Sequence, residues 1–178
     1  MEDSKIKLVE LAKKGNQEAF LKLIEEVKLK LYKTGISILK NDEDTCDAIQ
    51  ETLINAYKSL NTIKKNEYFS TWIMKILINK CYDIIRKNKK IINIDEKIKL
   101  EQDMYYEMYS QESELEVVLN KIDKDLKMVT VLYYYDDLSV REISEVLNIP
   151  EGTVKSRLSR ARSKIYAILK EEEGERFG

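Results

Sequence analysis

The sequence has no histidine, only two cysteines, one proline and five glycines among its 178 residues. Without histidine, the chain lacks the commonest general base and zinc ligand and every Ser-His or Cys-His nucleophile pair. The two cysteines, Cys46 and Cys81, are too few for a metal cage and form at most one bridge. We therefore expect no enzyme activity, no bound metal and no cofactor.

Turn-forming residues and long apolar runs are also scarce. One proline and five glycines are too few for the turns of a β-sandwich or β-barrel. No stretch has the length and hydropathy of a secretory signal or a membrane span. Charged residues make up 35% of the chain, a composition that favours helices. The sequence predicts an all-α, cytoplasmic protein without membrane insertion.

Neither sign of charge dominates, since 31 basic and 32 acidic residues give a formal net charge of -1. The charge is instead distributed in bands. Residues 64–90 hold eight basic and two acidic side chains, residues 151–170 hold six and one, and residues 91–125 hold four and ten. A basic run is often just a solvated helix face, but two of them in separate helical segments favour a polyanion that contacts both.

Helical periodicity divides the chain into two parts. Helices are predicted near 6–14, from 17 onward, from 45 to about 60 and over 67–89, and helical patterning resumes at 113. The segment 91–112 is acidic with weak periodicity. We therefore expect two small helical domains, 1–90 and 113–178, joined by a flexible linker, 91–112. Both cysteines are predicted to be buried, because Cys46 lies on the apolar side of the third helix and Cys81 on that of the fourth. The apolar face predicted for the third helix consists of Cys46, Ile49, Leu53, Tyr57 and Leu60.

The predicted helix 67–89 carries a polar stripe opposite its apolar side, on which Trp72 is expected to be a core residue. The members of the stripe recur every three or four positions, so they share one exposed face. Asp83 in this stripe has two interpretations: it contacts a ligand, or it pairs with Arg86 and Lys87 one turn later. The stripe consists of Lys75, Asn79, Asp83, Arg86 and Lys90.

The last 40 residues predict a helix-turn-helix. Ser139 and Glu142 form a capping-box pattern that opens a short helix over 140–147, Pro150 interrupts it, and a basic helix follows from about 151 to 170. Such a second helix fits the major groove of DNA, and its short hydroxyls and long cations suit phosphates and base edges. Lys155 and Arg160 are the candidate guanine readers. An amphipathic bundle helix is the alternative interpretation. The predicted core side is Val154, Leu158, Ala161, Ile165 and Leu169, and the predicted outward side is Thr153, Lys155, Ser156, Arg157, Ser159, Arg160 and Lys164.

These segments resemble a known family. The strings DLSVREIS (137–144) and IPEGTVKSRLSRAR (149–162) resemble the promoter-reading module of extracytoplasmic-function (ECF) sigma factors, members of the sigma-70 family of bacterial RNA polymerase. DAIQETLINAY (47–57) is similar to that family's polymerase-docking helix. FSTW (69–72), followed by Asn79, Asp83, Arg86 and Lys87, is similar to its promoter-melting helix. One departure is the start of the second domain, where the common Leu-Pro is replaced by residues 122–125, IDKD.

The resemblance implies a non-catalytic, dissociable polymerase subunit that recognises two promoter boxes and melts the downstream one. It assigns minus-35 recognition to Arg141 and the outward side of the last helix. Its implied partners are the β′ clamp helices and β flap of core RNA polymerase, promoter DNA and an anti-sigma factor. The residues implied for the minus-10 box are Ile63, which would line a pocket for a flipped base, Lys64, Lys65, Lys75, Asn79, Asp83, Arg86 and Lys87. The residues implied for polymerase docking are Asp47, Gln50, Glu51 and Asn55.

Two boxes about 25 base pairs apart are separated by roughly 85 Å at ~3.4 Å per pair. A linker of about 22 residues spans roughly 70–80 Å when extended and about 33 Å as a helix. We therefore expect a largely extended linker in the transcribing complex. A stand-alone dimeric helix-turn-helix regulator is the alternative function, although it leaves the stripe at 75–90 and the face at 47–55 without a role.

Overall fold

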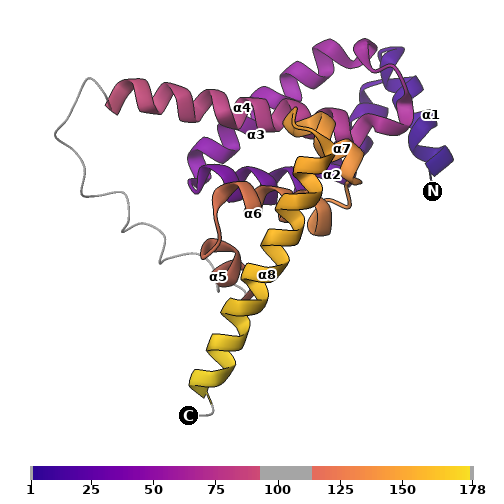
Figure 1. The fold of residues 1–178 in the computed structure, drawn as a ribbon. Coiled ribbons are helices and arrows are strands. Elements are labelled where there is room, and N and C mark those ends of the chain that lie inside the picture. The colour runs from indigo at the N-terminus through magenta and orange to yellow at the C-terminus, as the bar shows by residue number, and fades with distance from the viewer. Residues whose placement is uncertain (1, 93–113, 177–178) are drawn as a thin grey trace.

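The computed structural model describes residues 2–92 and 114–176. Within these ranges every regular element is helical, which confirms the predicted all-α class (Figure 1). The first group comprises α1 (Glu2–Lys13), α2 (Gln17–Leu39), α3 (Asp42–Ser59) and α4 (Phe69–Ile92), with 3-10 turns η1 (Leu60–Thr62) and η2 (Asn66–Tyr68) before α4. The second comprises α5 (Glu114–Asn120), α6 (Lys124–Thr130), the π-helical turn η3 (Val131–Tyr135), α7 (Val140–Leu147) and α8 (Glu151–Arg176).

Asparagine side chains set the starts of α2 and α3. The Asn16 side-chain oxygen accepts a hydrogen bond of 2.9 Å from the Ala19 amide, and that of Asn41 accepts one of 2.8 Å from the Asp44 amide. Each bond satisfies an amide that lacks a partner within its own helix. Three acidic residues in the first turn of α3 also suit the positive end of the helix dipole. α2 therefore begins at the predicted position, whereas α3 begins at Asp42, three residues before the predicted start at 45.

The buried face of α3 agrees with the predicted one only in part. Its buried residues are Thr45, Ala48, Thr52 and Ala56, whereas Tyr57 is 44% exposed. Small side chains face the core because α2 approaches closely: a Cβ added to Gly35 would lie 2.9 Å from the Thr45 Cγ2 atom. Of the predicted face, Leu60 is buried and Ile49 and Leu53 pack partly buried against the core, so the fully buried line lies about one position earlier. The expectation that Cys46 is buried is accordingly wrong, since Cys46 is exposed, and the expectation for Cys81 is confirmed.

One apolar cluster joins the two helix groups. It contains Leu23 and Leu31 of α2, Ile73 of α4, Leu132 of η3 and Ile143 of α7, all fully buried. Trp72 packs partly buried against this cluster, as expected for a core side chain. α7 lies against α4, and α6 and η3 lie against α2 (Figure 1). The second group of helices is thus docked on the first.

The predicted linker, 91–112, falls almost entirely outside the described residues. The fourth helix continues to Ile92, two residues beyond the predicted domain boundary, and description resumes at Glu114. The expected linker extension therefore stays a prediction.

Candidate nucleic-acid interface

The helix-turn-helix forms at the predicted positions. Ser139 caps α7 reciprocally: its hydroxyl accepts from the Glu142 amide, and its own amide donates to the Glu142 carboxylate at 2.9 Å. α7 ends at Leu147, and the next residue, Asn148, takes the left-handed conformation at φ 53°. The Ser144 hydroxyl donates to the Ile149 carbonyl at 2.6 Å and closes the turn. α8 then begins directly after Pro150, which cannot continue α7.

The inner side of α8 is as predicted over its first four turns. Val154, Leu158 and Ala161 are buried at 0–3% exposure, and Ile165 packs partly buried on a second apolar cluster. The prediction for Leu169 is wrong, because this side chain is 45% exposed. Ile168 packs against the cluster instead, because it continues the alternating spacing of four and three residues that runs from Val154 to Ile165.

The cations of α8 differ in their partners. The Arg157 guanidinium pairs with Asp125, and only 22% of the Arg157 side chain is exposed. Lys164 Nζ lies 2.6 Å from an Asp123 carboxylate oxygen, and this hydrogen bond lowers the pKa of Asp123. Both acids lie in the segment where the sequence departs from the family pattern. Arg157 and Lys164, two of the residues predicted to contact the minus-35 box, are therefore paired with acidic residues at the start of α6.

Lys155 and Arg160, the candidate guanine readers, are both exposed and form no ion pair within the described residues. Arg141 on α7 is exposed and 3.4 Å from Glu145. Ser156 and Ser159 are exposed beside the two readers, and Thr153 is half-buried. The outer face of α8 is thus a cationic surface with short hydroxyls between the cations, the pattern that suits a DNA groove.

A second cationic surface lies on α4. Lys75, Asn79 and Lys87 are exposed. The Arg86 guanidinium pairs with the Asp83 carboxylate one turn before it, which confirms the helical-pair interpretation of Asp83 in the free chain. The side chain of Lys90 lies outside the described set.

The loop before α4 differs from its expected role in one respect. Ile63 is 5% exposed and belongs to the core cluster, so its side chain does not offer a surface to a base in this structure. Its carbonyl accepts a 2.8 Å hydrogen bond from Lys13 Nζ, which also donates to Asn66 at 2.7 Å. These bonds fix the loop to α1. Beside it, Lys64 is exposed, and Lys65 is exposed and lies over the Tyr68 ring at 5.6 Å.

The predicted docking face of α3 is polar and adjoins the α4 stripe. Asp47, Gln50 and Glu51 are exposed, and Asn55 is half-buried. Lys80 of α4 reaches Glu51 at 2.8 Å, and this hydrogen bond lowers the pKa of the Glu51 carboxyl. The ion pair ties the two helices together beside the exposed polar face.

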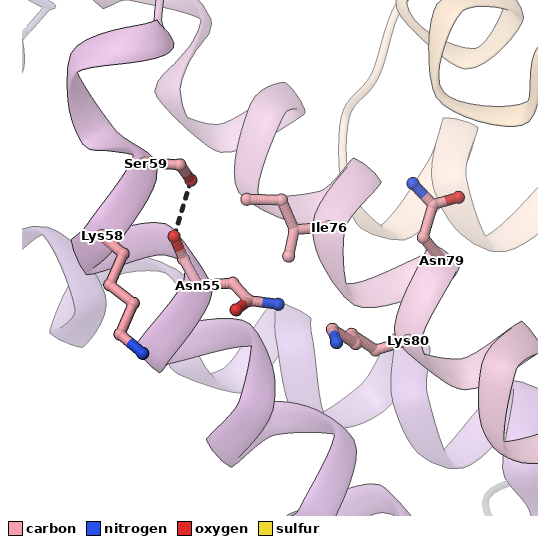
Figure 2. Close-up of a pocket in the computed structure, with 6 residues that line it drawn as sticks. All are labelled: Asn55, Lys58, Ser59, Ile76, Asn79 and Lys80. Carbon is pink, nitrogen blue, oxygen red and sulfur yellow. Dashed lines mark hydrogen bonds between the residues drawn. The ribbon is translucent and has the colours of Figure 1, made fainter.

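A groove of about 400 Å³ lies between α3 and α4. Figure 2 shows Asn55 and Lys80 reaching toward each other from opposite walls, with Asn79 one position before Lys80 on α4. A docking candidate, Asn55, and a minus-10 candidate, Asn79, therefore line one groove, which no local sequence pattern indicates. The lining residues are Asn55, Lys58, Ser59, Ile76, Asn79 and Lys80.

Within the described ranges, no group of three or more His, Cys, Asp or Glu side chains is arranged to hold a metal ion. Over the same ranges, no helix combines the length and apolar character needed to cross a bilayer.

Comparison with known proteins agrees with this geometry. Residues 23–91 match the family model for sigma-70 region 2, and residues 112–165 match that for sigma-70 region 4. The chain is 32% identical over 182 residues to the ECF RNA polymerase sigma factor SigW of Bacillus subtilis, covering 93% of this chain and 96% of that protein. It is 29% identical to the ECF RNA polymerase sigma-E factor of Escherichia coli, covering 89% and 90% of the two chains.

Solved structures show the same fold. CnrH, determined in complex with the cytosolic domain of CnrY, superposes with a TM-score of 0.69 at 24% identity and covers 94% of this chain and 97% of its own. The sigma factor RpoE of Bartonella quintana, determined with the anti-sigma factor NepR, gives 0.67 at 23% identity, covering 82% and 95%. Two sigma-70 regions in order, a helix-turn-helix in the second and near full-length similarity to SigW mean that the chain belongs to the ECF sigma factors, non-catalytic specificity subunits of RNA polymerase.

Proposed function

We propose that this sigma factor binds core RNA polymerase, directs it to promoters with two boxes and helps to melt the minus-10 box. The observation that carries the proposal is the presence of two exposed cationic surfaces on different domains, one on α4 and one on α8. Each offers cations for phosphates and polar side chains for base edges. This function is carried out in the cytoplasm, where the polymerase and the chromosome are.

For the minus-35 box, the proposed readers are Lys155 and Arg160, with Ser156 and Ser159 allowing close approach of the helix. Arg and Lys recognise guanine through its O6 and N7 atoms in the major groove. Thr153 and Arg141 are proposed as flanking contacts. Arg157 and Lys164 contribute to this surface after release from Asp125 and Asp123, because a phosphate competes with a carboxylate for the same cation.

For the minus-10 box, Lys75, Asn79, Arg86 and Lys87 are proposed to hold the separated strand, with Lys64 and Lys65 beside it. Positive charge along a groove stabilises single-stranded DNA. Asp83 is proposed to orient Arg86 and, when the ion pair between them opens, to accept a hydrogen bond from a base. Ile63 contacts a flipped base only after the loop rearranges, because it is buried in the free chain.

For docking to the β′ clamp helices, the proposed surface consists of Asp47, Gln50, Glu51 and Asn55, around the exposed Ile54. An apolar residue ringed by polar ones is a common arrangement in protein interfaces. The second domain is proposed to contact the β flap. We also propose an anti-sigma factor as a partner, because the related RpoE was determined with one.

Run-off transcription tests this function. The purified chain is mixed with core polymerase and a promoter library randomised at both boxes, and the transcribed templates are sequenced. The expected result is enrichment of specific bases at two boxes about 25 base pairs apart. A stand-alone regulator would bind DNA without polymerase and start no transcripts. Variant Asp47→Arg should lose transcription while DNA binding by α8 persists, which separates docking from promoter recognition.

A further inference from the structure

Polar side chains of the two domains pair across the contact between them. The Thr34 hydroxyl of α2 donates to the Asp136 carboxylate at 2.8 Å, and both residues are buried. Lys30, one turn earlier on α2, donates to the Asp136 carbonyl at 3.0 Å and pairs with Asp137 at 3.1 Å. On the other side of the interface, the Thr71 hydroxyl of α4 donates to Glu142 of α7 at 2.5 Å. The two domains are thus joined by specific bonds as well as by apolar packing.

This closed arrangement is too short to span two promoter boxes. Thr71 and Glu142 are in contact, so the path from Asn79 along α4 and through α7 to Arg160 is fixed. With ~1.5 Å of rise per helical residue and a fully extended turn at 148–151, the Asn79 and Arg160 Cα atoms lie at most about 55 Å apart. Boxes about 25 base pairs apart require roughly 85 Å. The domains must therefore separate before both boxes are bound.

Charged residues of the second domain also act on α4 across the interface. Tyr82 of α4 has a raised pKa, chiefly because it is partly buried, and the charges of Asp125 and Arg157 also act on it across the interface. The side chain of Arg157, paired with Asp125, is only 22% exposed.

The Asp136 carboxylate is incompletely satisfied at this interface. Its Oδ2 atom accepts from Thr34, whereas its buried Oδ1 atom has no hydrogen-bond partner in the described chain. Burial raises the pKa of Asp136 to about 6, while Thr34 and Lys30 act in the opposite direction and Asp137 adds to the increase. Lys33, the other cation on this side of α2, is over the Tyr135 ring at 4.5 Å. Separation of the domains would expose the unpaired Oδ1 atom of Asp136 to water and so relieve the cost of its burial. The contact therefore holds the domains together less tightly than a fully paired carboxylate would.

We propose that Lys30, Thr34 and Asp136 form a latch that holds the free sigma factor closed and thereby inhibits binding to two-box promoters until it opens. The claim that closure inhibits promoter binding rests on the proposed function. The claim that the free chain is closed does not, because it concerns the chain without polymerase or DNA.

Distance measurement between two spin labels tests the latch without polymerase or DNA. Cys46 on α3 is exposed and takes one label, whereas Cys81 is buried with its pKa raised to about 12 and stays unlabelled. The second label is attached to Ser163→Cys on the exposed side of α8. The latched chain should give one narrow, short distance distribution.

Three substitutions at Thr34 should change the ratio of closed to open molecules by increasing amounts. Thr34→Ser keeps the hydroxyl and should keep the short distance. Thr34→Val keeps the shape but leaves the carboxylate without its donor, which should shift the closed-to-open ratio by roughly 10- to 100-fold toward open. Thr34→Asp places a second carboxylate against Asp136 and should give mainly long distances. Lys28→Ala is the matched control, because Lys28 lies on the same helix and pairs only with Glu25 of that helix among the described residues.

Helical content is checked for each variant by circular dichroism. If Thr34→Asp loses helical content, the double variant Thr34→Val with Lys30→Ala replaces it and should likewise give mainly long distances. A broad, long distribution for the unsubstituted chain would overturn the proposal. So would short distances that persist in the folded Thr34→Asp variant. Failure of transcription with normal latch behaviour would instead count against the proposed function.

Discussion

Replacement of Asp136 by asparagine should remove a pH dependence from the stability of the protein. The pKa of this buried carboxyl is about 6 in the folded chain against an ordinary value of 3.8. Because the folded value is the higher one, the stabilisation by the protonated group is complete below pH 3.8 and is lost as the pH rises through about 6. One unit of pKa corresponds to about 1.4 kcal/mol.

Between pH 5 and pH 8, the free energy of unfolding should therefore fall by about 1.4 kcal/mol more in the unsubstituted chain than in Asp136→Asn. Urea unfolding followed by circular dichroism at several pH values gives this difference. Glu51, Asp123 and Glu142 have lowered pKa values and contribute with the opposite sign, but they are present in both proteins and cancel. Parallel pH profiles for the two proteins would refute the assignment of a buried, partly unpaired carboxylate.

Three further predictions concern packing, promoter reading and docking. Gly35→Ala should destabilise the fold by about 1–3 kcal/mol despite better helix propensity, because its Cβ would meet Thr45 Cγ2 at 2.9 Å. Gly152→Ala, with nothing within 4 Å, should instead stabilise by about 0.5–1 kcal/mol; thermal melts compare the two, and equal effects would contradict the close helix contact. Arg160→Ala should cost about 1–3 kcal/mol at one base pair in a binding assay over single-base promoter variants, whereas a uniform loss would make it a phosphate contact. Asp47→Ala should weaken binding to core polymerase in a fluorescence titration and leave promoter preference unchanged, and an unaltered affinity would remove it from the docking surface.

Local signals in the sequence were sufficient for the ends of several helices. Asn16, Asn41 and Ser139 each place a side-chain acceptor at the start of a helix, and the capping box predicted α7 over the residues it occupies. Pro150 and the left-handed Asn148 make the turn before α8. These features depend on neighbours within a few residues, so periodicity and capping rules predict them well.

Contacts between distant segments were not predictable in the same way. Thr34 and Asp136 are 102 positions apart, and nothing in either local pattern indicates a bond between them. Asp125, which pairs with Arg157, is similarly remote in sequence from α8. The departure from Leu-Pro at 122–125 was visible in the sequence, but its consequence for the cations of α8 required the packing of α6.

The error in α3 has an identifiable cause. Periodicity favours the large apolar side chains, but where α2 approaches α3 at Gly35 only small ones are fully buried, and Ile49 and Leu53 pack partly buried beside them. Thr45, Ala48, Thr52 and Ala56 recur at spacings of three and four, which is a helical stripe in its own right. A buried glycine on one helix and a small-residue stripe on the next were the signals that indicate the correct face.

Footprinting of the reconstituted holoenzyme on a selected promoter tests the central claim that one chain binds DNA through cationic surfaces on two domains. The expected result is protection at two sites about 25 base pairs apart, roughly 85 Å along the duplex. Lys155→Ala with Arg160→Ala should remove the upstream protection, and Lys75→Ala with Asn79→Ala should remove the downstream strand opening. Protection at a single site, or loss of both sites from either pair of substitutions, would contradict it.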